Sequence, residues 1–178
     1  MANKIKKRSD KIAFYGITEN NATTYYRMKG FTDFTVSKNP TEYSRKYVDE
    51  SFEQSDVVGY SPSVSFALDV IGGNKVAEDI EKISVNESLG ADVVRSIVIV
   101  DLSKSDNGKF DAVKRDFAVI IDTEGSGTDA YQISGTLKAK SNVVVGSATT
   151  SDSFETVTFT STMSSSDSTV VKASDDEL

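Results

Sequence analysis

The 178-residue sequence contains no cysteine and no histidine. Without cysteine, no disulfide can support the fold, and no thiolate can act as a nucleophile or as a ligand for a soft metal. Without histidine, the chain lacks Ser-His-Asp and Cys-His chemistry, most zinc sites, and the one side chain that titrates near neutral pH without perturbation. Hydrolases that use Ser-His-Asp or Cys-His chemistry and most zinc enzymes are therefore excluded.

Long apolar runs are also missing. Residues 1–17 are basic but contain no apolar run of signal-peptide length, and no later stretch is long enough to span a bilayer. We therefore expect the product to stay soluble where it is made. A chain of this length predicts one domain, residues 1–163, with a flexible N-terminal arm over about residues 1–20 and a polar, mobile C-terminal tail over residues 164–178.

The charge balance is acidic, with 20 Lys and Arg against 27 Asp and Glu, a formal net charge of −7. The summed field repels phosphate and disfavours ordinary DNA binding, which depends on basic groups that release counterions. Charge of this sign would suit a channel wall along which a duplex slides. A simple solubility charge is the alternative explanation.

Only two prolines are present, Pro40 and Pro62, and each begins a segment with the alternation of a β-strand. The first segment places Tyr43, Arg45 and Tyr47 on one face, where they could stack on sugar rings or nucleobases, or form an aromatic ladder between strands. The second has one apolar face, made of Val64, Phe66, Leu68 and Val70. The acidic connection between them, residues 48–61, is longer than a hairpin needs, and we expect it to be a functional loop.

The remaining pattern is mainly of strands. Gly72 and Gly73 break it, and a helix is predicted from Asn74, as the N-cap, to about Leu89, with Gly90 as its stop. The Asn107-Gly108 dipeptide predicts a hairpin turn. Further strands are predicted over 24–28 and 31–36, which we expect to pair, and over 93–102, 117–121, 131–139 and 154–162. The fold class is therefore α+β, a mainly antiparallel β-sandwich or open barrel with one packed helix.

The proline-containing segment resembles the major tail tube proteins of long-tailed, non-contractile bacteriophages. The order and spacing of its short motifs carry this resemblance, and their residues are Pro40, Glu42, Tyr43, Arg45, Tyr47, Asp49, Glu50, Asp56, Gly59, Tyr60, Pro62 and Asp69. The resemblance is sharp over about one fifth of the chain and rests on architecture elsewhere.

The resemblance implies a structural virion protein, not an enzyme, that forms rings of six stacked into a tail tube through which DNA and the tape measure protein pass. Its partners would be further copies of itself, the tape measure protein, the tail terminator and the tail-tip or initiator proteins, with no membrane. It would be assembled in the bacterial host cytoplasm and found in the virion. The same motif residues would lie at contacts between subunits, and the 48–61 loop would join stacked rings.

A continuous inner barrel would need four strands from each copy. We expect residues 43–48 and 62–70 to form one inner hairpin, and residues 117–122 and 131–140 the other. The polar residues of these strands would then face the channel, namely Ser63, Ser65, Gln132 and Ser134.

Other chemistry is weakly indicated. Paired carboxylates, as in glycosidases, could come from Asp122 with Glu124 and Asp129, or from Asp49 with Glu50, but an acidic chain provides such pairs by chance. Residues 101–108 fail as an EF-hand because the glycine comes late and no closing glutamate follows. We expect no catalytic residue, cofactor or metal site. The alternative function is a β-sandwich carbohydrate-binding or adhesion module that uses Tyr43, Tyr47 and Tyr60.

Overall fold

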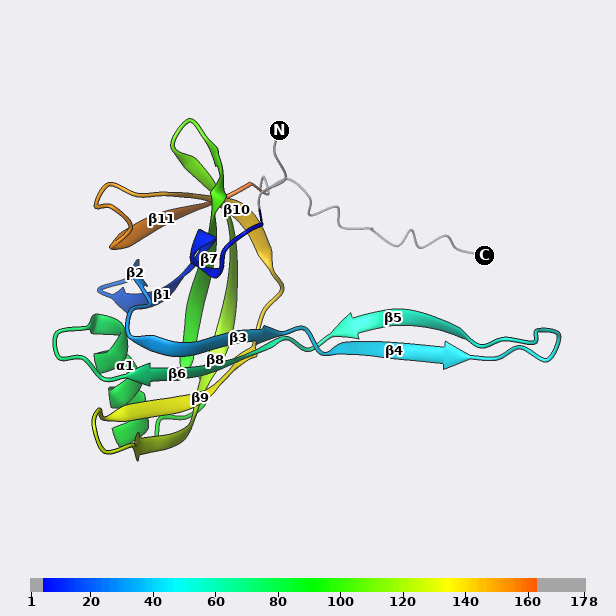
Figure 1. The fold of residues 1–178 in the computed structure, drawn as a ribbon, viewed down its shortest axis with the longest axis horizontal. Coiled ribbons are helices and arrows are strands. Elements are labelled where there is room, and N and C mark those ends of the chain that lie inside the picture. Colours follow the sequence, from blue (N-terminus) through cyan, green and yellow to red (C-terminus); the bar gives the residue numbers. More distant parts are fainter. Residues whose placement is uncertain (1–4, 163–178) are drawn as a thin grey trace, which may run out of the picture.

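The computed structural model describes residues 5–162, which form antiparallel β-strands and one α-helix (Figure 1). A 3₁₀ turn, η1 (Arg8–Asp10), precedes the first strand. The other elements are β1 (Lys11–Glu19), β2 (Ala22–Arg27), β3 (Phe31–Ser37), β4 (Pro40–Arg45), β5 (Gln54–Tyr60), β6 (Ser63–Asp69), α1 (Lys75–Val85), β7 (Val94–Asp106), β8 (Lys109–Ser126), β9 (Gln132–Ala139), β10 (Val144–Thr149) and β11 (Thr156–Ser161).

Six strands close a small barrel in the order β10-β11-β2-β1-β7-β8, because the first half of β8 pairs with β10 as well as with β7. The turn between β7 and β8 has positive φ at Asn107 and Gly108, which confirms the predicted turn dipeptide. The barrel interior holds a core of its own, made of Phe14, Val98, Val100, Ala112, Ala148 and Val157.

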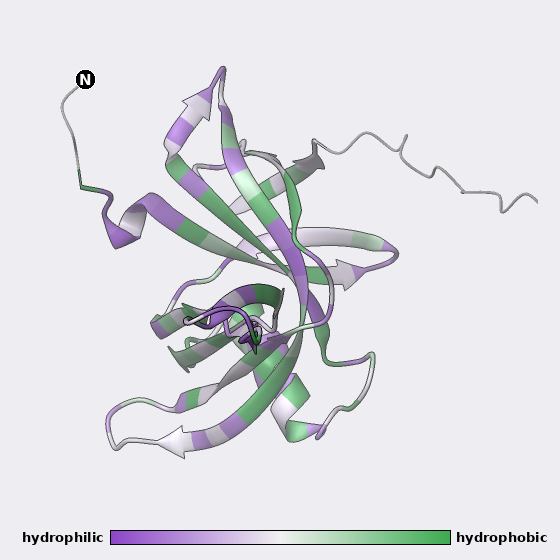
Figure 2. Ribbon diagram, turned by 90° about the vertical axis from the view of Figure 1, so that its right-hand side faces the viewer, coloured by the Kyte–Doolittle hydropathy of each residue, from purple (hydrophilic) through white to green (hydrophobic). Residues whose placement is uncertain are grey.

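A four-stranded sheet continues from the barrel, because β8 is long enough to serve both. From Phe117 onward, β8 pairs with β9, and the order continues through β6 to β3 at the edge. Hydrophilic and hydrophobic residues alternate along these strands, as Figure 2 shows. The apolar residues of β6 and β9 face α1, and together they form the second core around Phe66, Leu68, Ile80, Ile133 and Leu137.

Helix α1 forms where the sequence predicts it, but it is shorter. The side chain of Asn74 caps it by accepting hydrogen bonds from the backbone N–H of Val76 at 3.0 Å and of Ala77 at 3.4 Å. The apolar positions Val76, Ile80 and Ile83 are buried. The helix ends at Val85, with Asn86 as its C-cap, so Gly90 is not the stop.

Within residues 5–162, strands β4 and β5 pair only with each other, and they form a hairpin that continues β3 and β6 beyond the body (Figure 1). The two pairs of strands meet at Asn39 and Ser61, where the Ser61 N–H donates to the Asn39 carbonyl at 3.0 Å. The hairpin therefore projects from one end of the body while α1 lies at the other (Figure 1).

Several sequence predictions need correction. The prediction of a flexible N-terminal arm over residues 1–20 is wrong beyond Asp10. Strand β1 is one of the barrel strands, and its Phe14 and Tyr15 are fully buried. The predicted strands at 24–28 and 31–36 exist but do not pair, since β2 lies between β1 and β11 while β3 pairs with β6.

The prediction that residues 43–48 pair with residues 62–70 is also wrong, because β6 pairs with β3 on one side and with β9 on the other. Half of the expected 48–61 loop is strand β5, which takes the place of β6 as the partner of β4. Strand β10 has no counterpart among the predictions. The strands predicted at 93–102, 117–121, 131–139 and 154–162 are confirmed, with shifted ends. The predicted C-terminal tail lies outside the described residues.

Candidate assembly surfaces

The four-stranded sheet has one apolar face, covered by α1, and one polar face, which nothing covers among residues 5–162. On the polar face, neighbouring strands are joined by side-chain hydrogen bonds. Ser65 Oγ donates to Asp33 Oδ2 at 2.9 Å, Gln132 Nε2 donates to Asp69 Oδ1 at 3.0 Å, and the hydroxyls of Thr123 and Ser134 lie 2.7 Å apart. These bonds span β3, β6, β9 and β8, so the polar face is an ordered surface.

The charges on the polar face are mostly negative. Asp33, Asp69 and Asp122 lie on it beside the cation Lys138, and the Asp122 carboxylate accepts from Thr136 Oγ1 at 3.3 Å. Hydrogen bonds from Thr35 and Ser65 lower the pKa of Asp33, which keeps this carboxylate ionised. The face therefore repels phosphate and has few groups that could bind it.

The same sheet has two open edges. Strand β3 pairs with β6 on one side and with no strand on the other within residues 5–162. At the opposite edge, β8 pairs with β7 only as far as Ala118, so residues 120–126 have β9 on one side and no strand on the other in the described part of the chain. Open edges of this kind can pair with another chain.

The hairpin β4–β5 exposes unusually many apolar side chains. It buries no residue fully, and its large apolar residues are between 47% and 109% exposed, namely Tyr43, Tyr47, Val48, Phe52, Val57, Val58 and Tyr60. Arg45 lies over the Tyr43 ring, with its Cζ atom 5.3 Å from the ring centroid. An isolated two-stranded hairpin is only marginally stable in water, so we expect another molecule to cover these side chains.

The structure gathers most of the motif residues on this hairpin. Those from Pro40 to Tyr60 lie on β4, on β5 or on the turn between them, while Pro62 precedes β6 and Asp69 ends it. Tyr47 is not on a strand, because β4 ends at Arg45, so the expected stripe of three residues is limited to Tyr43 and Arg45.

The four residues predicted to line a channel lie on adjacent strands and share the polar face of the sheet. Ser65 is exposed, and Gln132 and Ser134 are half-buried. Ser63 is buried within its own chain and accepts a hydrogen bond from Asn39 Nδ2 at 3.1 Å. Asp33 and Thr35 also lie on this face and were not among the predicted residues, although their alternation with Phe34 and Val36 indicates it.

Three of the acidic residues considered for catalysis, Asp122, Glu124 and Glu50, accept hydrogen bonds from nearby side chains. Glu124 Oε2 accepts from Ser84 Oγ at 2.6 Å, and Glu50 accepts from Gln54 Nε2 at 2.8 Å. Among residues 5–162, no group of three or more acidic side chains is arranged to hold a metal ion. The one α-helix of this part is too short to cross a membrane.

No protein-family model and no curated protein matches the chain. Eight chains of solved structures match, among them one from the cryo-EM structure of the anti-feeding prophage (AFP) baseplate, symmetrised six-fold. That chain is 9% identical, the match covers 82% of this chain and 96% of that chain, and the TM-score is 0.45. At this level of similarity, the likeness does not identify a function.

Proposed function

We propose that this protein is the subunit of a phage-type tail tube, a structural virion protein and not an enzyme, which assembles as stacked rings of six. The observation that carries the proposal is the four-stranded sheet, because it combines one ordered polar face with two open edges. The resemblance of the hairpin sequence to tail tube proteins supports the same conclusion.

The strand directions are compatible with closure of a ring. Each of the three pairings from β3 to β8 is antiparallel, so β8 runs opposite to β3. In a ring related by rotation, the β3 strand of the next copy would run antiparallel to β8 and could pair with its open edge. Six copies would close a barrel of 24 strands, with a backbone diameter of about 48 Å at a spacing of about 4.8 Å and a tilt of about 40°.

In this arrangement the polar face lines the channel and α1 lies outside it. A wall that carries Asp33, Asp69 and Asp122 would repel the phosphates of a passing duplex, so DNA could slide. Ser65, Gln132 and Ser134 would face the channel. The tape measure protein would occupy it before the DNA, and terminator and tip proteins would cap its ends.

The test is disulfide cross-linking across the proposed ring contact, which has no background because the chain contains no cysteine. Thr35→Cys on β3 is combined in turn with Ile120→Cys, Asp122→Cys or Glu124→Cys on β8. Within one chain these strands are about 14 Å apart, too far for a disulfide. At least one pair should give a ladder that ends at six subunits, and negative-stain microscopy should show hollow tubes.

The matched control is Thr35→Cys with Thr136→Cys, because Thr136 lies on an inner strand of the sheet and should not cross-link. Small featureless particles without any ladder would overturn the proposal. If those particles also melted at a higher temperature in the presence of saccharides, the carbohydrate-binding alternative, with Tyr43 and Tyr60 as its exposed platform, would replace it.

A further inference from the structure

A pocket of ≈ 290 Å³ lies at the end of the body opposite the hairpin, between the end of β2, the glycine turn before α1 and the β10–β11 loop. Its charged lining residues are Arg27, Lys29, Lys75 and Glu155, three cations and one anion. Ile71 also lines it and is 52% exposed. This is a positive, partly apolar site on a chain whose net charge is −7.

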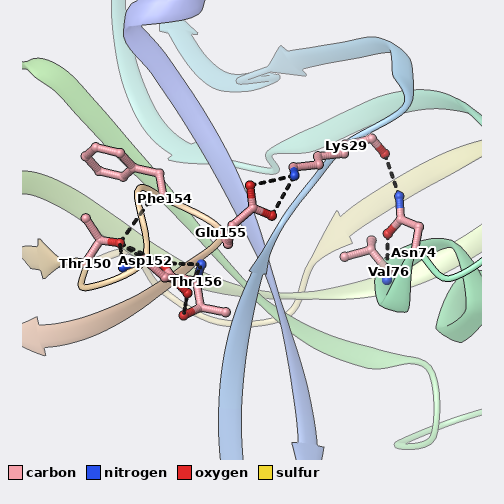
Figure 3. A network of polar contacts seen from close by, with 8 residues as sticks. All are labelled: Lys29, Asn74, Val76, Thr150, Asp152, Phe154, Glu155 and Thr156. Carbon is pink, nitrogen blue, oxygen red and sulfur yellow. Dashed lines mark hydrogen bonds and ion pairs between the residues drawn. The ribbon is translucent and has the colours of Figure 1, made fainter.

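Hydrogen bonds fix the shape of the pocket (Figure 3). Lys29 Nζ lies 2.6 Å from Glu155 Oε2, and the amide of Asn74, the helix cap, donates to the Lys29 carbonyl at 3.0 Å. The Arg27 N–H donates to the Glu155 carbonyl at 2.9 Å. Glu155 therefore neutralises Lys29, while the side chains of Arg27 and Lys75 have no partner in the described part of the chain. Two cations remain available for an anionic ligand.

The hairpin turn, residues 47–53, has the complementary chemistry. It carries Asp49, Glu50 and Glu53 and no cation. Glu50 accepts from Gln54, but Asp49 and Glu53 have no partner among residues 5–162. Phe52, between them, is 63% exposed. The turn therefore offers two free carboxylates beside an exposed aromatic ring.

We propose that this pocket is the docking site for the hairpin turn of a second copy in the adjacent ring, an inference that rests on the tube proposed above. Asp49 and Glu53 would pair with Arg27 and Lys75, and Phe52 would pack against Ile71. The hairpin extends about 30 Å from the body. It points away from the end of the body where β2 and the start of α1 lie (Figure 1), and these elements line the pocket, so the turn must come from another copy.

The position of the two surfaces determines the kind of assembly. Turn and pocket are different surfaces at opposite ends of one chain, so each contact leaves another turn and another pocket free. Such a heterologous contact does not close on itself but repeats along an axis. Ring closure through the sheet edges and stacking through the turn and pocket are therefore separable, and a variant can lose one without the other.

The test reverses the charges on each side of the contact. The pocket variant is Arg27→Glu with Lys75→Glu, the turn variant is Asp49→Lys with Glu53→Lys, and the third variant carries all four changes. Each two-site variant should still form rings, but the fraction of protein that sediments as tubes should fall about tenfold or more. The four-site variant restores opposite charges across the contact and should recover tubes.

Two controls separate charge from folding. Lys104→Glu with Lys109→Glu makes the same charge change as the pocket variant, but on the β7–β8 hairpin, and should leave the tubes intact. Thermal unfolding followed by circular dichroism should show that all variants remain folded. Lys75 is the first residue of α1, where a glutamate is favourable to the helix dipole.

The outcomes distinguish this inference from the proposed function. If the unmodified protein forms tubes and both two-site variants do so equally well, the docking site is wrong and the tube stands. If folded two-site variants lose tubes and the four-site variant does not recover them, the pairing of these residues is also wrong. If the unmodified protein forms no tube, the proposed function fails first.

Discussion

Strands β5 and β6 follow each other in the chain, separated only by Ser61 and Pro62, yet their burial is opposite. On β6, Val64, Phe66 and Leu68 are at most 2% exposed. On β5, Val57 and Val58 are 54% and 63% exposed. Both strands contain apolar, β-forming residues, so composition does not explain the difference.

The difference comes from what each strand finds within its own chain. Strand β6 lies between two strands and under a helix, whereas β5 pairs with β4 alone in the described part of the chain. The apolar area of the hairpin can therefore leave water only in contact with another molecule. We infer that the body supplies the folding free energy and the hairpin supplies association, and changes in the two regions should have separable effects.

The largest effect on assembly is expected when the hairpin is removed. Replacing residues 40–60 by Asn-Gly should abolish tubes and leave the body folded, with its Tm changed by only a few degrees, because few contacts of the body are lost. The replacement is feasible because Asn39 and Ser61 already form the hydrogen bond that closes a tight turn. Electron microscopy and calorimetry measure the two effects. A large fall in Tm would show that the hairpin stabilises the body.

The opposite experiment weakens the body and leaves the hairpin intact. Asp79 of α1 accepts hydrogen bonds from Arg95 Nε at 2.8 Å and from the Tyr15 hydroxyl at 2.8 Å, which ties the helix to β7 and β1. Burial, with the nearby Asp79 charge, raises the pKa of Tyr15 well above its usual value and keeps this hydroxyl a donor.

Asp79→Ala would remove the counter-charge of the half-buried Arg95 guanidinium, which keeps only its bonds to the carbonyls of Asp92 and Val94, and would leave the buried Tyr15 hydroxyl without its acceptor. The free energy of unfolding should therefore fall by about 3 kcal/mol. Urea unfolding measures it as a lower midpoint at an unchanged m-value. Glu78→Ala, on the exposed side of the same helix, is the control and should change the free energy of unfolding by less than about 0.5 kcal/mol. Equal losses for the two variants would contradict this role of Asp79.

Two glycines test how tightly the body and the hairpin are packed. A Cβ atom at Gly135, on β9, would collide with the carbonyl oxygen of Ile120 and lie 3.0 Å from the Phe66 ring. At Gly59, on β5, a Cβ atom would meet nothing closer than Thr41 at 3.9 Å. Gly135→Ala should therefore cost about 2 kcal/mol of unfolding free energy, and Gly59→Ala almost none. A loss at Gly59 equal to that at Gly135 would mean that the hairpin is as tightly packed as the body.

The sequence predicts those elements whose own pattern is complete. Helix α1 has a cap and an apolar stripe, and β9 alternates between Ile133 and Leu137 on one face and Gln132 and Ser134 on the other. These local signals do not depend on knowing the partner strand. The polar face could be anticipated in the same way for the residues on β6 and β9.

The pairing of strands could not be predicted, because it depends on contacts that are distant in the sequence. Residues 48–61 suggest a loop because this acidic stretch is longer than a hairpin needs, and that interpretation leaves β6 as the partner of β4, whereas residues 54–60 form β5 and pair with β4. The N-terminal strand was missed because the basic residues before Lys11 suggested an arm, although Phe14 and Tyr15 become core residues. The basic pocket is assembled from three separate segments, so no local pattern indicates it.

The smallest expected effect concerns a carboxylate in the body that keeps its partners within its own loop. Asp152 accepts hydrogen bonds from the hydroxyl of Thr156 at 2.6 Å and from its N–H at 3.0 Å, and these bonds lower the pKa of Asp152 to about 2 (Figure 3). Since this pKa is below the ordinary 3.8, the carboxylate stabilises the fold fully above pH 3.8 and loses that contribution as the pH falls to about 2.

The Tm of Asp152→Asn should therefore lie slightly below that of the unmodified protein at neutral pH. The difference should shrink to nothing between about pH 4 and pH 2. A constant difference for Asp152→Asn across this range would show that its hydrogen bonds do not stabilise the loop.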